Sequence, residues 1–161
     1  MLDQILNTWH VHNHMNQLLL NDLDKKALDA RPIAKRHGRN VAQQFAHIHN
    51  VRYYHLEAHA KKYLGKLKLI ESEKALNKRL LVDSLKESAT VMEKLLIDLA
   101  EERVKIKHYG SAVRLLGYLI SHESHHRGLI LISLKQSGIK LPVSAKYGIW
   151  EWFKDIEKYR I

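Results

Sequence analysis

The sequence predicts an all-α protein: an antiparallel four-helix bundle, with room for a short C-terminal helix. Apolar residues recur at intervals of three and four residues over four long stretches, which is the period of a helix that buries one face. Both prolines and several of the seven glycines fall between these stretches, where they mark connections. No stretch alternates apolar and polar residues with β-branched enrichment, so no sheet is expected.

The first two expected helices cover residues 2–22 and 40–66. Asn40 is a suitable N-cap for the second, because its side chain can accept a hydrogen bond from a free backbone N–H of the first turn. The connections that follow these helices, residues 23–39 and 67–79, are the longest, and they leave room for a crossover between helices.

The third expected helix covers residues 80–100, with Asp83 and Ser84 as alternative starts. The fourth follows Ser111, a capping residue, and ends at Gly138, a residue type that often terminates helices. Four long helices separated by loops predict a bundle.

Length and composition predict a single domain of residues 1–161 in the cytoplasm. The chain of 161 residues is long enough to bury a core. It contains no cysteine, which excludes disulfides, thiolate ligands and a cysteine nucleophile. The start of the chain lacks a basic segment followed by a long apolar one, and no apolar run reaches the ~18 residues of a membrane span.

The charge balance raises the question of nucleic-acid binding. Lysine and arginine number 27 against 17 acidic residues, a net charge of +10. The lysines are scattered, however, and only residues 35–39 form a compact basic loop. Scattered lysines are typical of a solvated surface, so nucleic acid is not an expected partner.

Three histidine pairs have the four-residue spacing that places both rings on one helix face: His10 with His14, His55 with His59, and His122 with His126. The face of His122 and His126 continues with leucines and carries no lysine or arginine, so we expect this pair inside the bundle. The face of His55 and His59 carries Arg52 and lysines, which indicates that this face is exposed to solvent. The residues around His10 and His14 do not indicate whether this pair is interior or exposed.

A third histidine can complete a metal site with the interior pair. His47 lies on a stripe of small and apolar residues of the second helix, whereas His49 is expected nearer the edge. His47 together with His122 and His126 would supply three nitrogen ligands and leave coordination positions open, as in catalytic zinc sites. The alternative is that these histidines are buried and only hydrogen-bonded.

Two segments resemble the DinB-like (YfiT-type) metalloproteins: Phe45-Ala46-His47-Ile48-His49-Asn50-Val51-Arg52 and His122-Glu123-Ser124-His125-His126-Arg127-Gly128. The resemblance covers nearly the whole chain. It implies a four-helix bundle, often a homodimer, with a divalent metal, commonly zinc or nickel, bound by His47, His122 and His126. Leu129 departs from the pattern, because many members have glutamine after this glycine.

The resemblance also implies a reaction. Several members resemble S-transferases that join a low-molecular-weight thiol to an electrophilic substrate, and others have no known reaction. A three-histidine site with an open position is suited to this chemistry, because a bound cation stabilises a thiolate at neutral pH. The expected partners are therefore a small-molecule thiol and its electrophile.

Competing functions remain open at this point. His122-Glu123-Ser124-His125-His126 matches H-E-x-x-H, the zinc-peptidase helix with Glu123 as general base and, here, Glu151 as a third ligand. Leu129 and Ile132 stand where the extended motif requires glycine and histidine, and no strand is available to align a peptide. A non-catalytic bundle with a stabilising metal is the other alternative.

Two further features have two interpretations each. Arg127 either binds an anionic thiol or forms a structural ion pair, and a basic rim that includes residues 35–39 is expected to attract such a thiol. The short C-terminal helix, expected at residues 150–159, begins with an aromatic cluster that either caps the bundle or lies at a dimer interface. The cluster consists of Trp150, Trp152 and Phe153.

Overall fold

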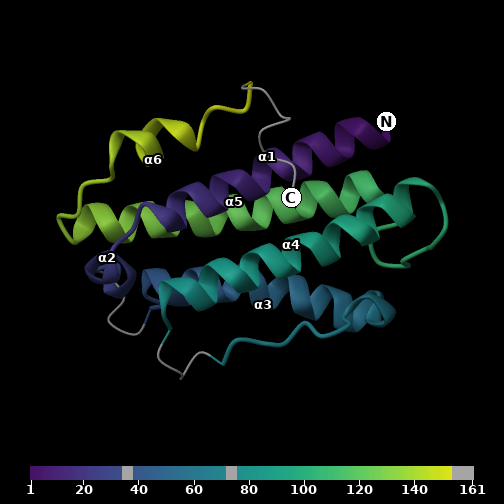
Figure 1. The fold of residues 1–161 in the computed structure, drawn as a ribbon, viewed down its shortest axis with the longest axis horizontal. Helices are drawn as coiled ribbons and strands as arrows, with labels where there is room; N and C mark the ends of the chain where they lie inside the picture. The colour runs from purple at the N-terminus through teal and green to yellow at the C-terminus, as the bar shows by residue number, and fades with distance from the viewer. Residues whose placement is uncertain (34–37, 72–75, 154–161) are drawn as a thin grey trace.

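The computed structural model describes residues 1–33, 38–71 and 76–153, and this part of the chain is helical without any strand. The elements are α1 (Leu2–Asn21), α2 (Lys25–Asp29), α3 (Val41–His59), a short 3₁₀ helix η1 (Lys61–Tyr63), α4 (Lys78–Ala100), α5 (Ala112–Gln136) and α6 (Val143–Gly148). The four long helices α1, α3, α4 and α5 pack against one another (Figure 1). The predicted all-α helical bundle is confirmed.

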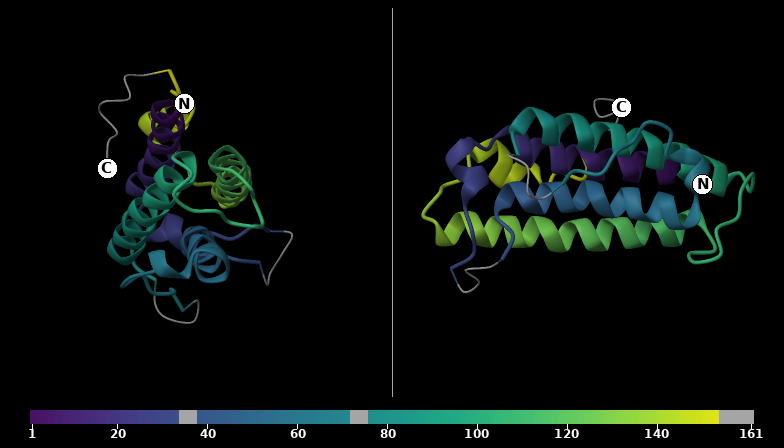
Figure 2. Two further views of the ribbon diagram at one scale, coloured as in Figure 1. Left: turned by 90° about the vertical axis from the view of Figure 1, so that its right-hand side faces the viewer. Right: turned by 90° about the horizontal axis from the view of Figure 1, so that it is seen from below.

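Helices α1 and α3 lie at opposite corners of the bundle, and each packs against both α4 and α5 (Figure 2). Helices α1 and α4 run antiparallel, because Trp9 contacts Ala89 while Gln17 contacts Val82. Helices α3 and α5 also run antiparallel (Figure 1). Helices α3 and α4 run in the same direction, so the connection between them is the crossover for which the sequence left room.

Side-chain caps start three of the long helices. Asn40 and Gln43 form a capping box at the start of α3, and Ser111 caps α5, as the sequence predicts. The start predicted for the third helix at Asp83 or Ser84 is wrong. The side chain of Asn77 accepts a hydrogen bond from the backbone N–H of Leu80 and begins α4 at Lys78.

Two other boundaries differ from the prediction. Helix α3 ends at His59 rather than at residue 66, because Ala60 leaves the helical conformation with φ −149° and ψ 44°. Residues 150–153 lie outside any helix, so the helix expected at 150–159 does not begin there, and residues 154–159 lie outside the described part. Helix α6 comes earlier in the chain, and it has only six residues, as α2 has only five.

The interior consists of two apolar clusters. One surrounds Met15, Leu19 and Phe45, and the other surrounds Trp9 and Met92; all five of these side chains are fully buried. A belt of buried polar side chains crosses the bundle as well. Among the helices described, none has both the length and the apolar character needed to cross a bilayer.

Candidate metal centre

Three histidines from two helices converge at one place in the bundle. His47 comes from α3, and His122 and His126 come from consecutive turns of α5. Each offers a ring nitrogen, and the three nitrogens lie within 4.8 Å of one another. The ring centroids are 4.5 Å apart for His47–His126 and His122–His126, and 5.4 Å apart for His47–His122. The structure therefore brings together the three residues that the sequence predicts, in a group that could hold a metal ion.

The side chain of Gln44 orients one of the three rings. Its Oε1 accepts a hydrogen bond of 2.7 Å from Nδ1 of His126. Because Nδ1 carries the proton of the neutral ring, Nε2 of His126 carries the lone pair. That Nε2 lies 3.1 Å from Nε2 of His122. A hydrogen bond that fixes the tautomer in this way is typical of histidines that bind metals.

His122 is not held by a structural hydrogen bond on its other side. Its Nδ1 is buried, and it has no hydrogen-bond partner among the residues that the structure describes. Tyr118, one turn earlier on α5, stacks on the ring with centroids 5.7 Å apart and an interplanar angle of 12°. The alternative of a buried histidine fixed by backbone or carboxylate groups therefore does not describe His122.

Burial keeps the three imidazoles neutral. It lowers the pKa of His47 to about 4 and that of His126 to about 3, and it also lowers the pKa of His122. The positive charge of Arg39 lowers all three pKa values further, so this exposed arginine lies close enough to act on the site. Three neutral imidazoles form a donor set that suits zinc and nickel.

Glu123 follows His122 on α5 and takes part in a buried polar network. It forms a two-pronged ion pair with Arg52: Nε and Nη2 of the arginine donate to Oε1 and Oε2, each at 2.7 Å. Nε2 of His12 and Nδ2 of Asn16 donate to the same Oε2 at 2.7 Å and 2.6 Å. Glu123 and Arg52 are 1% and 0% exposed, and the network joins α1, α3 and α5.

The network bears on two expectations from the sequence. Burial alone would raise the pKa of the Glu123 carboxyl, but the charge of Arg52 and the hydrogen bonds from Arg52 and His12 outweigh burial and hold it far below its usual value. A carboxylate with both oxygens occupied in this way is not placed to act as the general base of a peptidase. The assignment of Arg52 to a solvent-facing surface is wrong, since it is the partner of Glu123.

A second side chain also lies deeper than predicted. His49, expected near the edge, is 1% exposed, with its ring nitrogens 2.9 Å from the carbonyl oxygen of Ser84 and 2.8 Å from that of Lys68. Arg127 is buried as well, and it donates to Asn16 Oδ1 and to Ser124 Oγ, each at 2.7 Å.

The remaining two histidine pairs are divided between interior and surface. His10 is buried, and its Nε2 lies 3.1 Å from Oε1 of Glu93. In the pair expected at the surface, His59 is exposed and His55 is half-buried beside Tyr109. The half-buried side chain of Leu129 follows Gly128 on α5.

The C-terminal aromatic residues are largely at the surface: Trp150 is 69%, Trp152 37% and Phe153 84% exposed. The ring of Trp152 lies 6.4 Å from that of His12, so this tryptophan covers the edge of the buried network.

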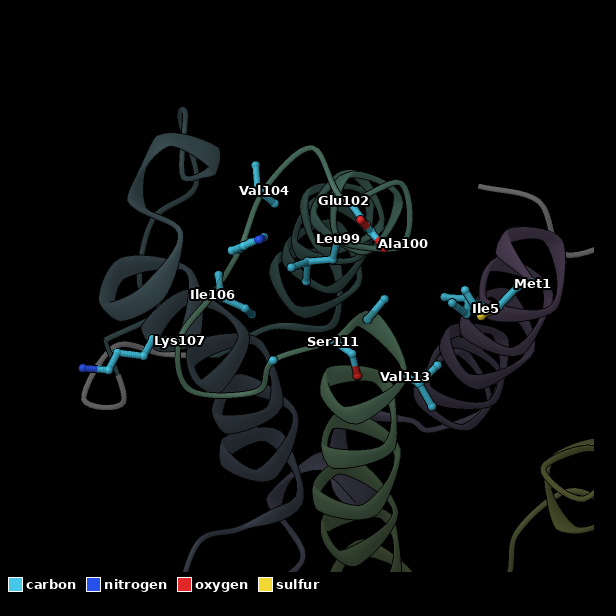
Figure 3. A pocket seen from close by; sticks show the side chains of 13 residues that line it. Met1, Ile5, Leu99, Ala100, Glu102, Val104, Ile106, Lys107, Ser111 and Val113 are labelled. Carbon is cyan, nitrogen blue, oxygen red and sulfur yellow. The ribbon is translucent and has the colours of Figure 1, made fainter.

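A cavity of about 710 Å³ lies elsewhere, at the end of the bundle where α1 and α5 begin and α4 ends (Figure 3). Ile5, Leu99 and Ile106 contribute apolar walls, and Ser111 lies at its base. None of the residues that line it is a histidine, so this cavity does not belong to the metal centre.

Sequence reasoning missed two residues of the site, Gln44 and Tyr118. Spacing was an available signal for both, because Gln44 lies one turn before His47 and Tyr118 one turn before His122. Arg39 belongs to the basic loop of residues 35–39, which the sequence predicts at the rim of the site, and its charge acts on all three histidines.

Comparison with known proteins identifies one family. The sequence model of the DinB family matches residues 1–154 of the chain. No curated protein and no solved structure matches the sequence.

Proposed function

The chain belongs to the DinB family, and we propose that it binds one divalent metal ion, zinc or nickel, through His47, His122 and His126. The observation that carries this proposal is the convergence of three ring nitrogens within 4.8 Å of one another. Three features support it: the rings are neutral, Gln44 fixes the lone pair of His126, and Nδ1 of His122 lacks a hydrogen-bond partner in the described part of the chain.

We further propose that the site serves a metal-dependent transfer of a small thiol to an electrophilic substrate. A divalent ion held by three neutral imidazoles keeps open positions and lowers the pKa of a thiol bound there. The chain itself contributes Arg39, whose positive charge beside the histidines attracts an anionic thiol. No protein nucleophile is required, which agrees with the absence of cysteine.

The alternatives differ in their support. A non-catalytic bundle shares every feature of the metal centre, so only an assay separates it from the transferase. A peptidase is disfavoured by Glu123, whose oxygens are occupied by Arg52, His12 and Asn16. A single domain over residues 1–161, a cytoplasmic location and a homodimer remain part of the proposal.

The test uses metal-loaded protein without a histidine tag. It is incubated with low-molecular-weight thiols, such as glutathione or cysteine, and with a generic electrophile. Turnover should disappear after removal of the metal and in His126→Ala. Turnover that survives either change would remove the metal from the mechanism, and the absence of turnover with every thiol would favour the non-catalytic bundle.

A further inference from the structure

A row of histidine and tyrosine rings leads from the metal centre to the surface along the contact of α3 and α5. Tyr118 stacks on His122, and His55 of α3 packs against Tyr118 with ring centroids 4.8 Å apart. His59 follows one turn later on α3, with its ring 6.1 Å from that of His55. The proposed function uses only the inner end of this row.

A fourth histidine, from a different segment, lies at the outer end of the row. His108, in the connection between α4 and α5, lies with its ring centroid 4.9 Å from that of His59. Its neighbour Tyr109 packs against His55 and His59, and the Tyr109 hydroxyl is hydrogen-bonded to His55 at 3.0 Å. Tyr109 thereby holds this connection against α3 and keeps His108 beside His59.

The rings of His59 and His108 are stacked, and their separation is compatible with two imidazoles that share an ion. Ring nitrogens lie about 2.0–2.1 Å from a bound zinc ion, which places the centroids of two neighbouring rings roughly 5 Å apart. The value of 4.9 Å for His59–His108 falls in this range, as do those of the inner three histidines. The planes of His59 and His108 are nearly parallel, at 9°, so the two exposed rings must turn toward each other to bind.

We propose that His59 and His108 form a second and weaker divalent-metal site at the surface, beside His55, whose ring is hydrogen-bonded to Tyr109. Imidazole donors without thiolate or carboxylate favour zinc, nickel and copper over magnesium or calcium. Two exposed ligands completed by water bind less tightly than three ligands of which two are half-buried and one is buried. Nearby lysines, Lys62 and Lys107 among them, repel a cation and weaken the site further.

The experiment is equilibrium dialysis of tag-free protein against zinc chloride and against nickel chloride. Four proteins are compared: wild type, the double variant His59→Ala/His108→Ala, His122→Ala, and the control Lys62→Ala/Lys107→Ala. Wild type and control should bind two ions per chain, one tightly and one weakly. The double histidine variant should lose only the weak ion, and His122→Ala should lose only the tight one.

A wild type that saturates at one ion per chain would overturn the second site, as would a weak ion that persists in the double histidine variant. Circular dichroism melting of each variant checks the fold. His59 and His108 are exposed, so their replacement should preserve it.

A second measurement uses the wild type alone: substoichiometric Cu²⁺ added to zinc-loaded protein should broaden the NMR signals of the His59 and His108 rings. Unbroadened signals would also contradict the proposal. If the inner histidines bind no metal, the weakly bound ion at His59 and His108 should still be measured. The two proposals can therefore be refuted separately.

Discussion

Gln44 of α3 holds His126 of α5 through a single buried hydrogen bond, 2.7 Å long, from the histidine Nδ1 to the glutamine Oε1. The two residues are 82 positions apart in the sequence, and Gln44 lies one turn before His47 on the same helix. Two side chains of α3 therefore act on the ring of His126: Gln44 sets its tautomer, and His47 packs against it.

Gln44→Leu should weaken zinc and nickel binding by about 10- to 100-fold, the usual effect of losing a partner behind a metal-binding histidine. The variant removes the acceptor for Nδ1–H, so the tautomer with a free Nε2 is no longer favoured. Gln44→Glu keeps an acceptor at the same place and should bind metal as well as the wild type. Competition titration with a chelator measures both, and equal affinities for Gln44→Leu and wild type would refute a role for the contact.

Arg52→Met should destabilise the metal-free protein by about 3–5 kcal/mol, because it leaves the carboxylate of Glu123 buried without its partner. Adding Glu123→Gln to Arg52→Met should recover part of the loss, since the double variant buries no unpaired carboxylate. Urea denaturation gives the free energies of unfolding. Simple additivity of the two single changes would mean that the pair is not coupled.

The metal-free protein should lose stability as the pH falls from about 6.5 toward 4. In the unfolded chain histidine takes up a proton near pH 6.5, whereas burial lowers the pKa to about 4 for His47 and about 3 for His126 in the folded chain. The unfolded state therefore binds more protons in this window, and acid favours unfolding. Replacing both residues by glutamine should flatten the fall of the urea midpoint between pH 7 and pH 5. An unchanged fall would assign the pH dependence to other groups.

Arg39→Gln should strengthen metal binding slightly and weaken the binding of an anionic thiol. The arginine charge lowers the pKa of all three site histidines, and it repels a metal cation for the same reason. The effect on the metal should be on the order of 1 kcal/mol or less, because Arg39 is exposed, and it should shrink with added salt. Arg79→Gln removes the same charge from an arginine whose side chain is 93% exposed at the start of α4, and it is the control. Identical results for the two variants would leave Arg39 without a specific role.

The long helices could be predicted from the sequence because each repeats its apolar pattern over several turns. Helices α2 and α6 could not, since five and six residues are too few to show a period. The end of α3 was placed too late because no proline or glycine marks Ala60, where the backbone leaves the helix.

The candidate site was only partly visible in the sequence. The spacing and apolar surroundings of His122 and His126 indicated an interior pair, and His47 was identified from a stripe of small residues. Arg52 was misplaced because an arginine beside lysines normally indicates solvent, and its partner Glu123 lies 71 residues away. Long-range pairing of this kind leaves no local pattern.

X-ray absorption spectroscopy of tag-free protein loaded with one equivalent of zinc tests the central claim most directly. We expect three imidazole nitrogens at about 2.0–2.1 Å from the ion in the wild type, and a clear loss of imidazole scattering in His126→Ala. A wild-type spectrum with oxygen ligands and no imidazole, or the same spectrum in both proteins, would contradict a metal site at His47, His122 and His126.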